Sequence, residues 1–567
     1  MYLIPSVKET IKGEKIEIAG CNFVFPDDID TRIVKLSQKV PVGETKVVLK
    51  VGKEDSEEYK ISIDKEVLIE AKGTKGAFYA IQTLRQIVKN GYSDVSEIND
   101  KPDLEIRGYY FDITRGRIPT VQTVKTLIDN LAYYKVNMLQ LYVEHVFPFK
   151  EYDGIYQRTG YITPDELKEI DAYCHENFID FIPSLSCFGH LYELLESDKY
   201  KHLCELTNDE HKTHFWQRRM AHHTINPSDP ESIELIKSLI DQFMPCFTSK
   251  YFNICCDETF DLGKGKNQGK DPAVLYTDFV KQITDYVRSK GKTPMMWGDI
   301  VEHIDPLGDD IVFLNWGYSP NEKPDRIYTL KNANKTQIVC PGVNGWTSLC
   351  ERVKASVPNI TKMAQYAYDA GAKGLMNTNW GDYGHIAPIE ACMYGTIFGC
   401  AKAWNVNCEY NDFDEAIDFL YYGYNGAAKM LKIIDTAHRV TYWYDLVCDY
   451  SNEAFKTVAM WCGTPGPDEL EKAYYEIEDI IPYLQCTKWE NESAREALYI
   501  VASGAQYMIS MLFSKQTGEK LGVIFSDIEE WIKEYASIYL KESKEGELKE
   551  FIKVFYHLAQ KYIKQGK

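Results

Sequence analysis

The sequence predicts an α/β protein in which a (β/α)8 TIM barrel follows an N-terminal α+β domain and precedes a C-terminal helical region. Three observations predict this order. Short alternating apolar runs occur before residue 100, strand-like runs alternate with amphipathic helices up to about residue 405, and strand signals vanish beyond it. We therefore expect an α+β domain over residues 1–100, the barrel over 101–405 and a helical domain over 406–567.

The first hundred residues favour a sheet with one covered face. Apolar residues alternate with polar ones in Lys15–Ala19, Lys46–Val51 and Glu66–Ala71, which is the period of a half-buried strand. Residues Gly76–Val88 instead have apolar side chains at helical spacing. A small sheet covered by a helix satisfies both patterns, because each apolar face then has a partner.

Eight strand–helix units in the central region indicate a closed barrel. The expected strands are Gly108–Ile113, Val136–Val143, Phe178–Ser184, Tyr251–Cys256, Thr293–Trp297, Ile311–Trp316, Gln337–Pro341 and Lys373–Trp380. Thr163–Glu166 reads Thr-Pro-Asp-Glu, a capping box that predicts the start of one helix. The rival fold is an open, doubly wound sheet, which usually has a phosphate-binding glycine loop after its first strand; Phe111–Gly116 is not such a loop.

Long helical patterns fill the last part of the chain, and they predict a helical domain that packs on the barrel or forms a partner surface. The expected helices are Asp414–Tyr422, Ala427–Tyr444, Asp468–Leu484, Glu492–Phe513, Ile524–Tyr539 and Leu548–Lys564.

Composition excludes several classes of partner. The formal net charge of −20 argues against nucleic acid and anionic membranes, because both need a basic face. Residues Met1–Thr10 lack the apolar segment of a signal peptide, and no stretch of 18 uninterrupted apolar residues predicts a membrane span. The 15 cysteines show no disulfide framework, so we expect reduced thiols in a cytoplasmic protein. We find no cofactor motif and no recognisable metal-ligand spacing.

The residues at the ends of the expected strands suggest a sugar pocket. In a (β/α)8 barrel the chemistry lies at the C-terminal ends of the strands. The fourth strand ends in the adjacent acids Asp257 and Glu258, and buried acid pairs are costly enough to indicate a site. Carboxylates, one arginine, two histidines and four tryptophans follow the other strands. Aromatic walls with paired acids are what sugar binding and hydrolysis need.

These motifs resemble glycoside hydrolase family 20, the β-N-acetylhexosaminidases. The residues similar to the family are the helix motif Gly76–Gln86, the first barrel strand Arg107–Arg115, the second strand Asn137–Tyr142, Phe188–His190, the Asp257-Glu258 pair and Trp380–Asp382. The acid pair is the most specific of them. The resemblance covers roughly residues 1–405 and leaves the helical tail outside it.

The resemblance implies removal of a terminal β-linked GlcNAc or GalNAc from an oligosaccharide or glycoconjugate, with retention and without an enzyme nucleophile. The substrate's own 2-acetamido oxygen attacks C1 and gives an oxazolinium intermediate. Glu258 is then the proton donor, and Asp257 orients the acetamido N–H and stabilises its developing charge. Two acids this close also push their pKa values apart.

The remaining roles come from the same resemblance. Arg115 is expected to bind the 3- and 4-hydroxyls, Asp382 the 4-/6-hydroxyl side, and His190 to lie close to the acid. Trp297, Trp316 and Trp380 wall the acetamido and ring pocket, and Glu144 falls where many members have an aspartate. Members usually place after the seventh strand a tyrosine that donates to the acetamido oxygen, which this chain lacks there; the replacements we consider are Asn344, Tyr318 and Tyr383.

Two alternatives stay open from the sequence. The first is a conventional two-carboxylate retaining β-glycosidase, with Glu144 as nucleophile and Glu258 as acid. The second is a catalytically silent sugar-binding protein on the same scaffold. Activity towards sugars without an acetamido group favours the first, and binding without turnover favours the second.

Overall fold

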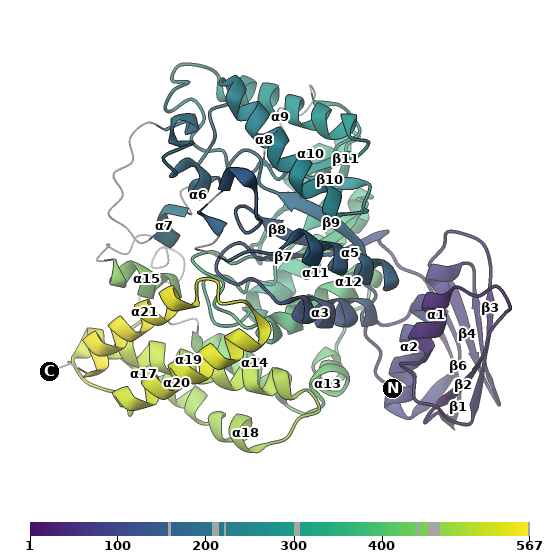
Figure 1. Ribbon diagram of the computed structural model, residues 1–567. Coiled ribbons are helices and arrows are strands. Elements are labelled where there is room, and N and C mark those ends of the chain that lie inside the picture. Colours follow the sequence, from purple (N-terminus) through teal and green to yellow (C-terminus); the bar gives the residue numbers. More distant parts are fainter. Residues whose placement is uncertain are drawn as a thin grey trace.

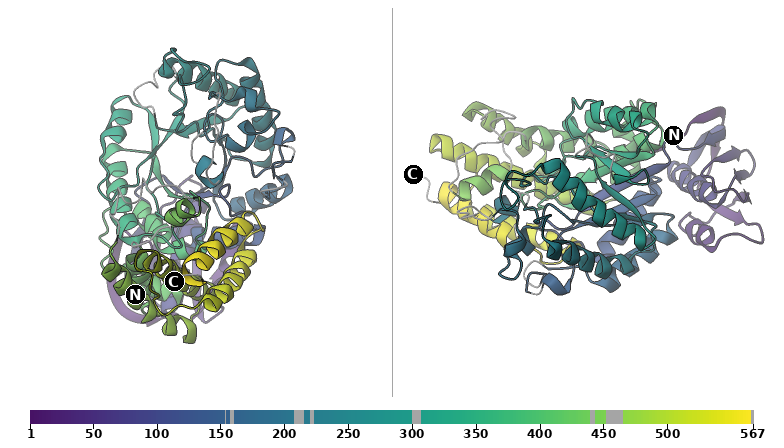
Figure 2. Two further views of the ribbon diagram at one scale, coloured as in Figure 1. Left: turned by 90° about the vertical axis from the view of Figure 1, so that its left-hand side faces the viewer. Right: turned by 90° about the horizontal axis from the view of Figure 1, so that it is seen from above.

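The computed structural model describes residues 1–567 except 153, 157–159, 207–214, 220–222, 300–306, 439–442, 452–464 and 565–567. The barrel lies between the N-terminal sheet domain and the C-terminal helices, as Figures 1 and 2 show from three directions. The predicted fold class is confirmed in all three of its parts. The boundaries near residues 100 and 405 stay a proposal.

The N-terminal domain is a six-stranded sheet in the order β1-β6-β4-β5-β3-β2. Its elements are β1 (Glu9–Glu17), β2 (Cys21–Val24), α1 (Thr31–Ser37), β3 (Thr45–Val51), β4 (Tyr59–Ile63), β5 (Val67–Ala71), α2 (Thr74–Asn90) and β6 (Tyr92–Asp100). Both helices cover the sheet face that is turned toward the barrel (Figure 1). Helix α2 buries Phe78, Ile81 and Leu84 and ends at Gly91, whose φ of 77° only glycine adopts easily.

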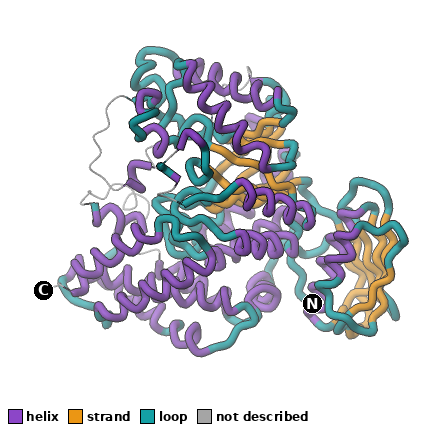
Figure 3. The backbone as a smooth tube through the Cα atoms, in the orientation of Figure 1, coloured by secondary structure: helices purple, strands orange, loops and turns teal. Residues whose placement is uncertain are grey.

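The eight predicted barrel strands are all present, and they close in the order β10-β11-β12-β13-β14-β7-β8-β9 with every pairing parallel. They are β7 (Ile106–Asp112), β8 (Met138–Val143), β9 (Asp180–Leu185), β10 (Tyr251–Asn253), β11 (Thr293–Trp297), β12 (Val312–Trp316), β13 (Thr336–Cys340) and β14 (Gly374–Asn379). In Figure 3 the strands form the centre of this part and helices surround them.

Strand β10 ends three residues earlier than the apolar pattern predicts. Cys255 and Cys256 have φ values of 57° and 63°, in the left-handed region, and therefore cannot continue the ladder. Glu258 has a φ of 49° as well. Such backbone is rare outside glycine and costs on the order of 1–3 kcal/mol per residue, so it is typical of functional segments. It also explains how two consecutive acids reach the same pocket, which a regular strand would prevent by pointing them to opposite faces.

The helices of the barrel follow the predicted alternation. They are α3 (Val121–Tyr133), α5 (Pro164–Glu176), α8 (Pro230–Phe243), α9 (Pro272–Ser289), α10 (Asp325–Asn332), α11 (Val353–Ala370) and α12 (Met393–Trp404), with the short helices α6 (Tyr192–Leu195) and α7 (Phe215–Arg219) between β9 and α8. The predicted capping box is confirmed at α5. Thr163 accepts from the backbone N–H of Glu166, and Glu166 accepts from the backbone N–H of Thr163.

The C-terminal region is helical throughout its described part. It contains α13 (Phe413–Ile417), the π-helix η7 (Asp418–Tyr422), α14 (Ala427–His438), α15 (Trp443–Tyr450), α17 (Pro467–Glu478), α18 (Ile481–Cys486), α19 (Glu492–Thr517), α20 (Phe525–Glu542), α21 (Leu548–Ala559) and the π-helix η8 (Gln560–Lys564). Residues 439–442 of the expected helix Ala427–Tyr444 lie outside the described residues.

Helix α19 is the centre of this region. By length and composition it is the one described helix that could cross a membrane, yet 83% of its apolar 18-residue window is buried inside the fold. Its neighbours include α17, α18 and α20. The apolar character of α19 is therefore accounted for by packing inside the helical region.

Candidate active site

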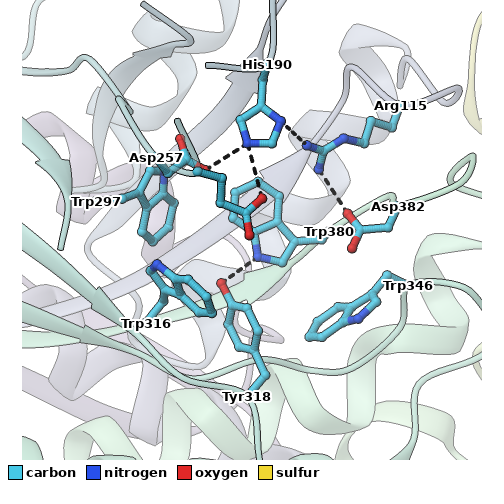
Figure 4. A pocket seen from close by; sticks show the side chains of 10 residues that line it. Arg115, His190, Asp257, Trp297, Trp316, Tyr318, Trp346, Trp380 and Asp382 are labelled. Atoms are coloured by element: carbon cyan, nitrogen blue, oxygen red, sulfur yellow. Dashed lines mark hydrogen bonds and ion pairs between the residues drawn. The ribbon is translucent and has the colours of Figure 1, made fainter. Parts of the chain in front are cut away.

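A pocket of about 150 Å³ opens at the C-terminal ends of the barrel strands, where the sequence predicts the chemistry. Its lining comes from seven of the eight strand ends: Arg115, His190, Asp257, Glu258, Trp297, Trp316, Tyr318, Trp346, Trp380 and Asp382 (Figure 4). The volume is on the scale of one sugar ring. Aromatic rings on one side and charged groups on the other match a polar ligand with one apolar face.

His190 joins the two adjacent acids. Its Nε2 lies 3.3 Å from Asp257 Oδ2 and 3.4 Å from Glu258 Oε2. Burial disfavours a charged imidazole, but the Asp257 carboxylate and the hydrogen bonds to both acids outweigh burial and raise the pKa of His190 to about 10. Nε2 therefore has a proton and faces both acids.

The same three side chains could in principle bind a cation, because their ligand atoms lie within 4.8 Å of one another. The proton that His190 has in the absence of a metal would have to leave before its Nε2 could ligate one. The ion pairs of His190 with Asp257 and Glu258 account for the geometry without a metal.

Arg115 lies next to His190, with its Nη2 3.3 Å from the His190 Nδ1, and is fixed there by three carboxylates. Its guanidinium donates to Asp112 at 3.1 Å and to Asp382 at 3.0 Å, and it lies 3.3 Å from Glu144. Asp112 is fully buried and also accepts from the backbone N–H of Arg115 and of Gly381. Arg115 and Asp382, from the first and last strands of the barrel, are thereby held as one polar unit (Figure 4).

Burial acts differently on the two carboxylates that flank Arg115. It raises the pKa of Asp382 to about 6, although the charge of Arg115 opposes the rise. Burial also acts to raise the pKa of Glu144, but the charge of Arg115 and the His145 imidazole, whose Nδ1 lies 3.7 Å away, outweigh it and lower that pKa to about 2. Glu144 is therefore a permanent anion, and Asp382 changes its charge within the range in which many enzymes work.

The aromatic wall is a connected cluster. The ring centroids of Trp297 and Trp380 lie 5.5 Å apart, and Trp316 stacks on Tyr318 at 5.2 Å with an interplanar angle of 24°. The Trp380 indole donates to the Tyr318 hydroxyl at 2.7 Å. This bond fixes the hydroxyl oxygen as an acceptor and leaves its hydrogen to be donated elsewhere.

Two residues important to the pocket belong to the strand ends read from the sequence, but no role was predicted for either. Trp346 lines the pocket and packs edge-on against Tyr318 at 5.1 Å. Asp299 follows β11 and lies behind the acid: it accepts the Glu258 backbone N–H at 2.8 Å and the Trp316 indole N–H at 2.6 Å. Burial and the charge of Asp257 raise the pKa of Asp299 to about 7.

Three of the residues proposed from the sequence do not line the pocket. Glu144 is buried behind Arg115. Asn344 donates its amide to the carbonyl of Gly342, and Tyr383 packs its ring against Tyr444 at 4.3 Å. Of the three replacements considered for the absent tyrosine, only Tyr318 belongs to the lining.

A closed parallel barrel with an acid pair, a histidine and aromatic walls at its strand ends defines a glycoside hydrolase. Family models agree with this assignment. The model described as "Glycosyl hydrolase family 20, catalytic domain" matches residues 105–345, and the model of domain 2 of the same family matches residues 25–107. The chain belongs to glycosyl hydrolase family 20.

Two curated relatives are distant in sequence, and the match covers less than half of each of them. The chain is 25% identical over 281 residues to a lacto-N-biosidase of Bifidobacterium bifidum. The match covers 46% of this chain and 24% of that protein. It is 25% identical over 329 residues to a beta-hexosaminidase of Porphyromonas gingivalis, spanning 51% of this chain and 40% of the relative. The chain thus spans less than two thirds of the length of these curated relatives.

Solved structures extend the similarity of fold to the helical tail. The chitobiase of Flavobacterium johnsoniae matches 97% of this chain and 99% of its own with a TM-score of 0.61 at 16% identity. The beta-N-acetylhexosaminidase of Bacteroides fragilis matches 73% of this chain and 94% of its own with a TM-score of 0.60 at 18% identity. The helical region, outside the resemblance of the sequence motifs, is therefore part of a fold seen elsewhere.

Proposed function

We propose that this glycoside hydrolase is an exo-acting, retaining β-N-acetylhexosaminidase that works by substrate-assisted catalysis. The observation that supports this most is the pairing of Asp257 and Glu258 through His190 in a pocket the size of one sugar. Family membership agrees with it. The substrate is a terminal GlcNAc or GalNAc of an oligosaccharide or glycoconjugate.

The reaction needs one proton transfer in each direction. Glu258 gives its proton to the glycosidic oxygen as the C1–O bond breaks, and the acetamido carbonyl oxygen bonds to C1 from the opposite face. Asp257 accepts the acetamido N–H and offsets the positive charge that develops on it. Water then attacks C1, the acetamido C–O bond at C1 breaks, and Glu258 takes a proton from the water. The sugar leaves with its original anomeric configuration.

The polar unit of Arg115 and Asp382 holds the non-reducing end of the sugar. A guanidinium donates to the 3- and 4-hydroxyls, and a carboxylate accepts from the 4-/6-hydroxyl side. Trp380 lies under the apolar face of the ring, and Trp297 and Trp316 wall the acetamido group. This unit closes one side of the pocket, which supports an exo mode of action.

We assign the donor to the acetamido oxygen to Tyr318, which follows the sixth strand instead of the seventh. Its oxygen already accepts from Trp380, so its O–H remains a donor, with Thr378 as its other side-chain partner in the absence of substrate. Burial raises the pKa of Tyr318 well above its ordinary value, so the hydroxyl keeps its proton and stays a donor. Asn344 and Tyr383 are engaged outside the lining.

The position of Glu144 argues against a conventional retaining glycosidase. An enzyme nucleophile has to reach C1, yet Glu144 is buried behind the Arg115 guanidinium and receives a hydrogen bond from the Tyr142 hydroxyl. A carboxylate neutralised in this way is a poor nucleophile. Its role is to hold Arg115, and through His145 and His190 to influence the charge near the acids.

A panel of aryl glycosides tests the proposal. We expect release of p-nitrophenol from a β-N-acetylglucosaminide or a β-N-acetylgalactosaminide and little from the β-glucoside, because only the first two contain the internal nucleophile. A thiazoline mimic of the intermediate is expected to inhibit competitively. Equal turnover of the β-glucoside would establish the two-carboxylate alternative, and sugar binding without turnover of any substrate would establish a silent binding protein.

We also propose a cytoplasmic location. The 14 cysteines among the described residues are all free thiols, and 12 of them are buried. Proteins of oxidising compartments more often pair their cysteines. Fractionation of the native host, with the enzyme followed by its hydrolytic activity, tests this; activity confined to the medium contradicts it.

A further inference from the structure

The loop after β7 places Arg115 in the pocket, and we call residues 113–120 the Arg115 loop. It connects the first barrel strand to α3 and includes Gly116, whose φ is 105°. Barrel contacts fix the first part of the loop: Asp112 accepts from the backbone N–H groups of Thr114 and Arg115, and the Arg115 carbonyl accepts the N–H of His385. The backbones of Gly116, Ile118 and Thr120 instead form hydrogen bonds with the C-terminal helical region.

Residues 542–547, which connect α20 to α21, run alongside the Arg115 loop. Thr120 donates its backbone N–H to Glu542, Lys544 donates to Ile118, and Glu547 donates to Gly116, at 3.0, 2.8 and 3.1 Å. The Tyr539 hydroxyl of α20 donates to the same Gly116 carbonyl. The helical region therefore pairs with residues 116–120 of the loop, as an added strand does.

The side chain of Glu547 fixes a second loop. It is buried and accepts from Arg219 at 2.7 Å and from the Trp216 indole at 2.6 Å. The Trp216 ring packs so closely on Gly384 that an added Cβ there would lie 3.0 Å from it. Gly384 follows Asp382 by two residues. Glu547 thus reaches the loop of Asp382 through Trp216 and the loop of Arg115 through Gly116.

We propose that the connection between α20 and α21 is part of the substrate site, with Tyr539 and Glu547 as positioning residues for Arg115 and Asp382. Neither residue lines the pocket. Both hold the backbone from which the polar unit projects. The helical region then serves the barrel's sugar site directly, because the two strand-end loops that bind the non-reducing end are closed by contacts from outside the barrel.

Hydrogen exchange tests the positioning without any reference to activity. Tyr539→Phe removes only the hydroxyl, and Glu547→Gln removes the charge facing Arg219. We expect faster amide exchange over residues 113–120 in both variants, because local opening becomes easier when those contacts are lost. Tyr556→Phe and Glu545→Gln, which change side-chain contacts within the helical region, with Glu529 and with Lys549, serve as matched controls and are expected to exchange as the wild type does.

Kinetics of the same variants test the route through Arg115, and this part rests on the proposed function. We expect Tyr539→Phe to lower kcat/KM by about tenfold, since small displacements of a positioned group cost this much or more. In an Arg115→Lys background the same change is expected to cost less than about twofold, because coupled residues are not additive.

The outcomes separate the two proposals. Wild-type exchange over residues 113–120 in a folded Tyr539→Phe protein would overturn the positioning role, as would an equal loss of kcat/KM in both backgrounds. If Glu547→Gln fails to fold, Tyr539→Phe decides alone. A wild-type enzyme that hydrolyses no aryl β-N-acetylhexosaminide would overturn the proposed function, while the exchange measurement would still decide the positioning.

Discussion

The backbone N–H of Glu258 donates to the Oδ2 of Asp299 at 2.8 Å, and the other oxygen of Asp299 accepts the Trp316 indole at 2.6 Å. One carboxylate thus fixes both the backbone of the proposed acid and a wall of the acetamido pocket. An amide in its place has only one acceptor oxygen, so one of the two N–H groups loses its partner. We expect Asp299→Asn to lower kcat by about 100-fold, since a misplaced acid loses this order of rate.

The comparison for Asp299→Asn is Asp278→Asn, an exposed position on α9. Steady-state kinetics and thermal melting on both variants separate catalysis from stability. A Tm close to that of the wild type with a large fall in kcat is the expected pattern. Unchanged kcat in a folded Asp299→Asn protein would show that Asp299 does not position the acid.

Glu258→Gln is expected to distinguish leaving groups. A general acid contributes about 10²–10⁴-fold to the rate, and its contribution falls when the leaving group departs easily as an anion. The variant should therefore lose little activity on a dinitrophenyl β-N-acetylglucosaminide and several orders of magnitude on a disaccharide. Equal losses on both substrates, measured as kcat/KM, would remove Glu258 from the role of acid.

Asp382 is expected to lower the activity of the enzyme at acidic pH. Burial raises its pKa to about 6, so below that value the side chain is neutral and no longer accepts from the sugar as an anion or pairs with Arg115. We expect kcat/KM to fall by up to about tenfold per pH unit below about pH 6, mainly through KM. Asp382→Asn should have lower activity at every pH and should not show this fall in kcat/KM at acidic pH. If the same fall persists in the variant, it is caused by the titration of another group.

The protonation of His190 beside the two acids is expected to make the stability of the fold depend on pH in the alkaline range. Its pKa is about 10 in the folded protein and 6.5 in the reference state, so folding binds the proton more tightly. A raised pKa means that the stabilisation is complete below about pH 6.5 and is lost as the pH rises through about 10. The Tm of the wild type is therefore expected to exceed that of His190→Asn most at neutral or lower pH. A gap that widens toward alkaline pH would contradict the charged His190.

Strand ends were the part of the site that the sequence could predict. Once apolar periodicity locates a barrel strand, the residue after it is placed in the mouth by the fold itself, which is why Arg115, Asp257 and Asp382 were found. The backbone at the fourth strand was not predictable. Left-handed conformations at Cys255 and Cys256 have no glycine to signal them, and they depend on the packing of the finished barrel.

No role was predicted for the residues that act by holding a neighbouring residue in place, and the reason is a different one. Asp299 works by accepting a backbone N–H, and any residue type except proline would offer one at position 258, so no motif marks the pair. Glu547 lies 432 positions after Arg115 in the chain and reaches it only through the packing of separate parts of the structure. Such relationships are properties of the tertiary structure, and local patterns contain no trace of them.

Tyr318 offers the sharpest test of how this chain compensates for the tyrosine absent after the seventh strand. Tyr318→Phe keeps the stacking on Trp316 and removes only the hydroxyl between Trp380 and the pocket. In the proposed mechanism the acetamido oxygen is the nucleophile, so loss of its orienting donor should lower kcat by about 10- to 100-fold and leave the Tm nearly unchanged. Tyr383→Phe is the matched control, since that ring packs on Tyr444 outside the lining. If Tyr383→Phe shows the larger loss, the acetamido donor comes from the eighth strand loop instead, and the pocket has to rearrange around the substrate to bring it in.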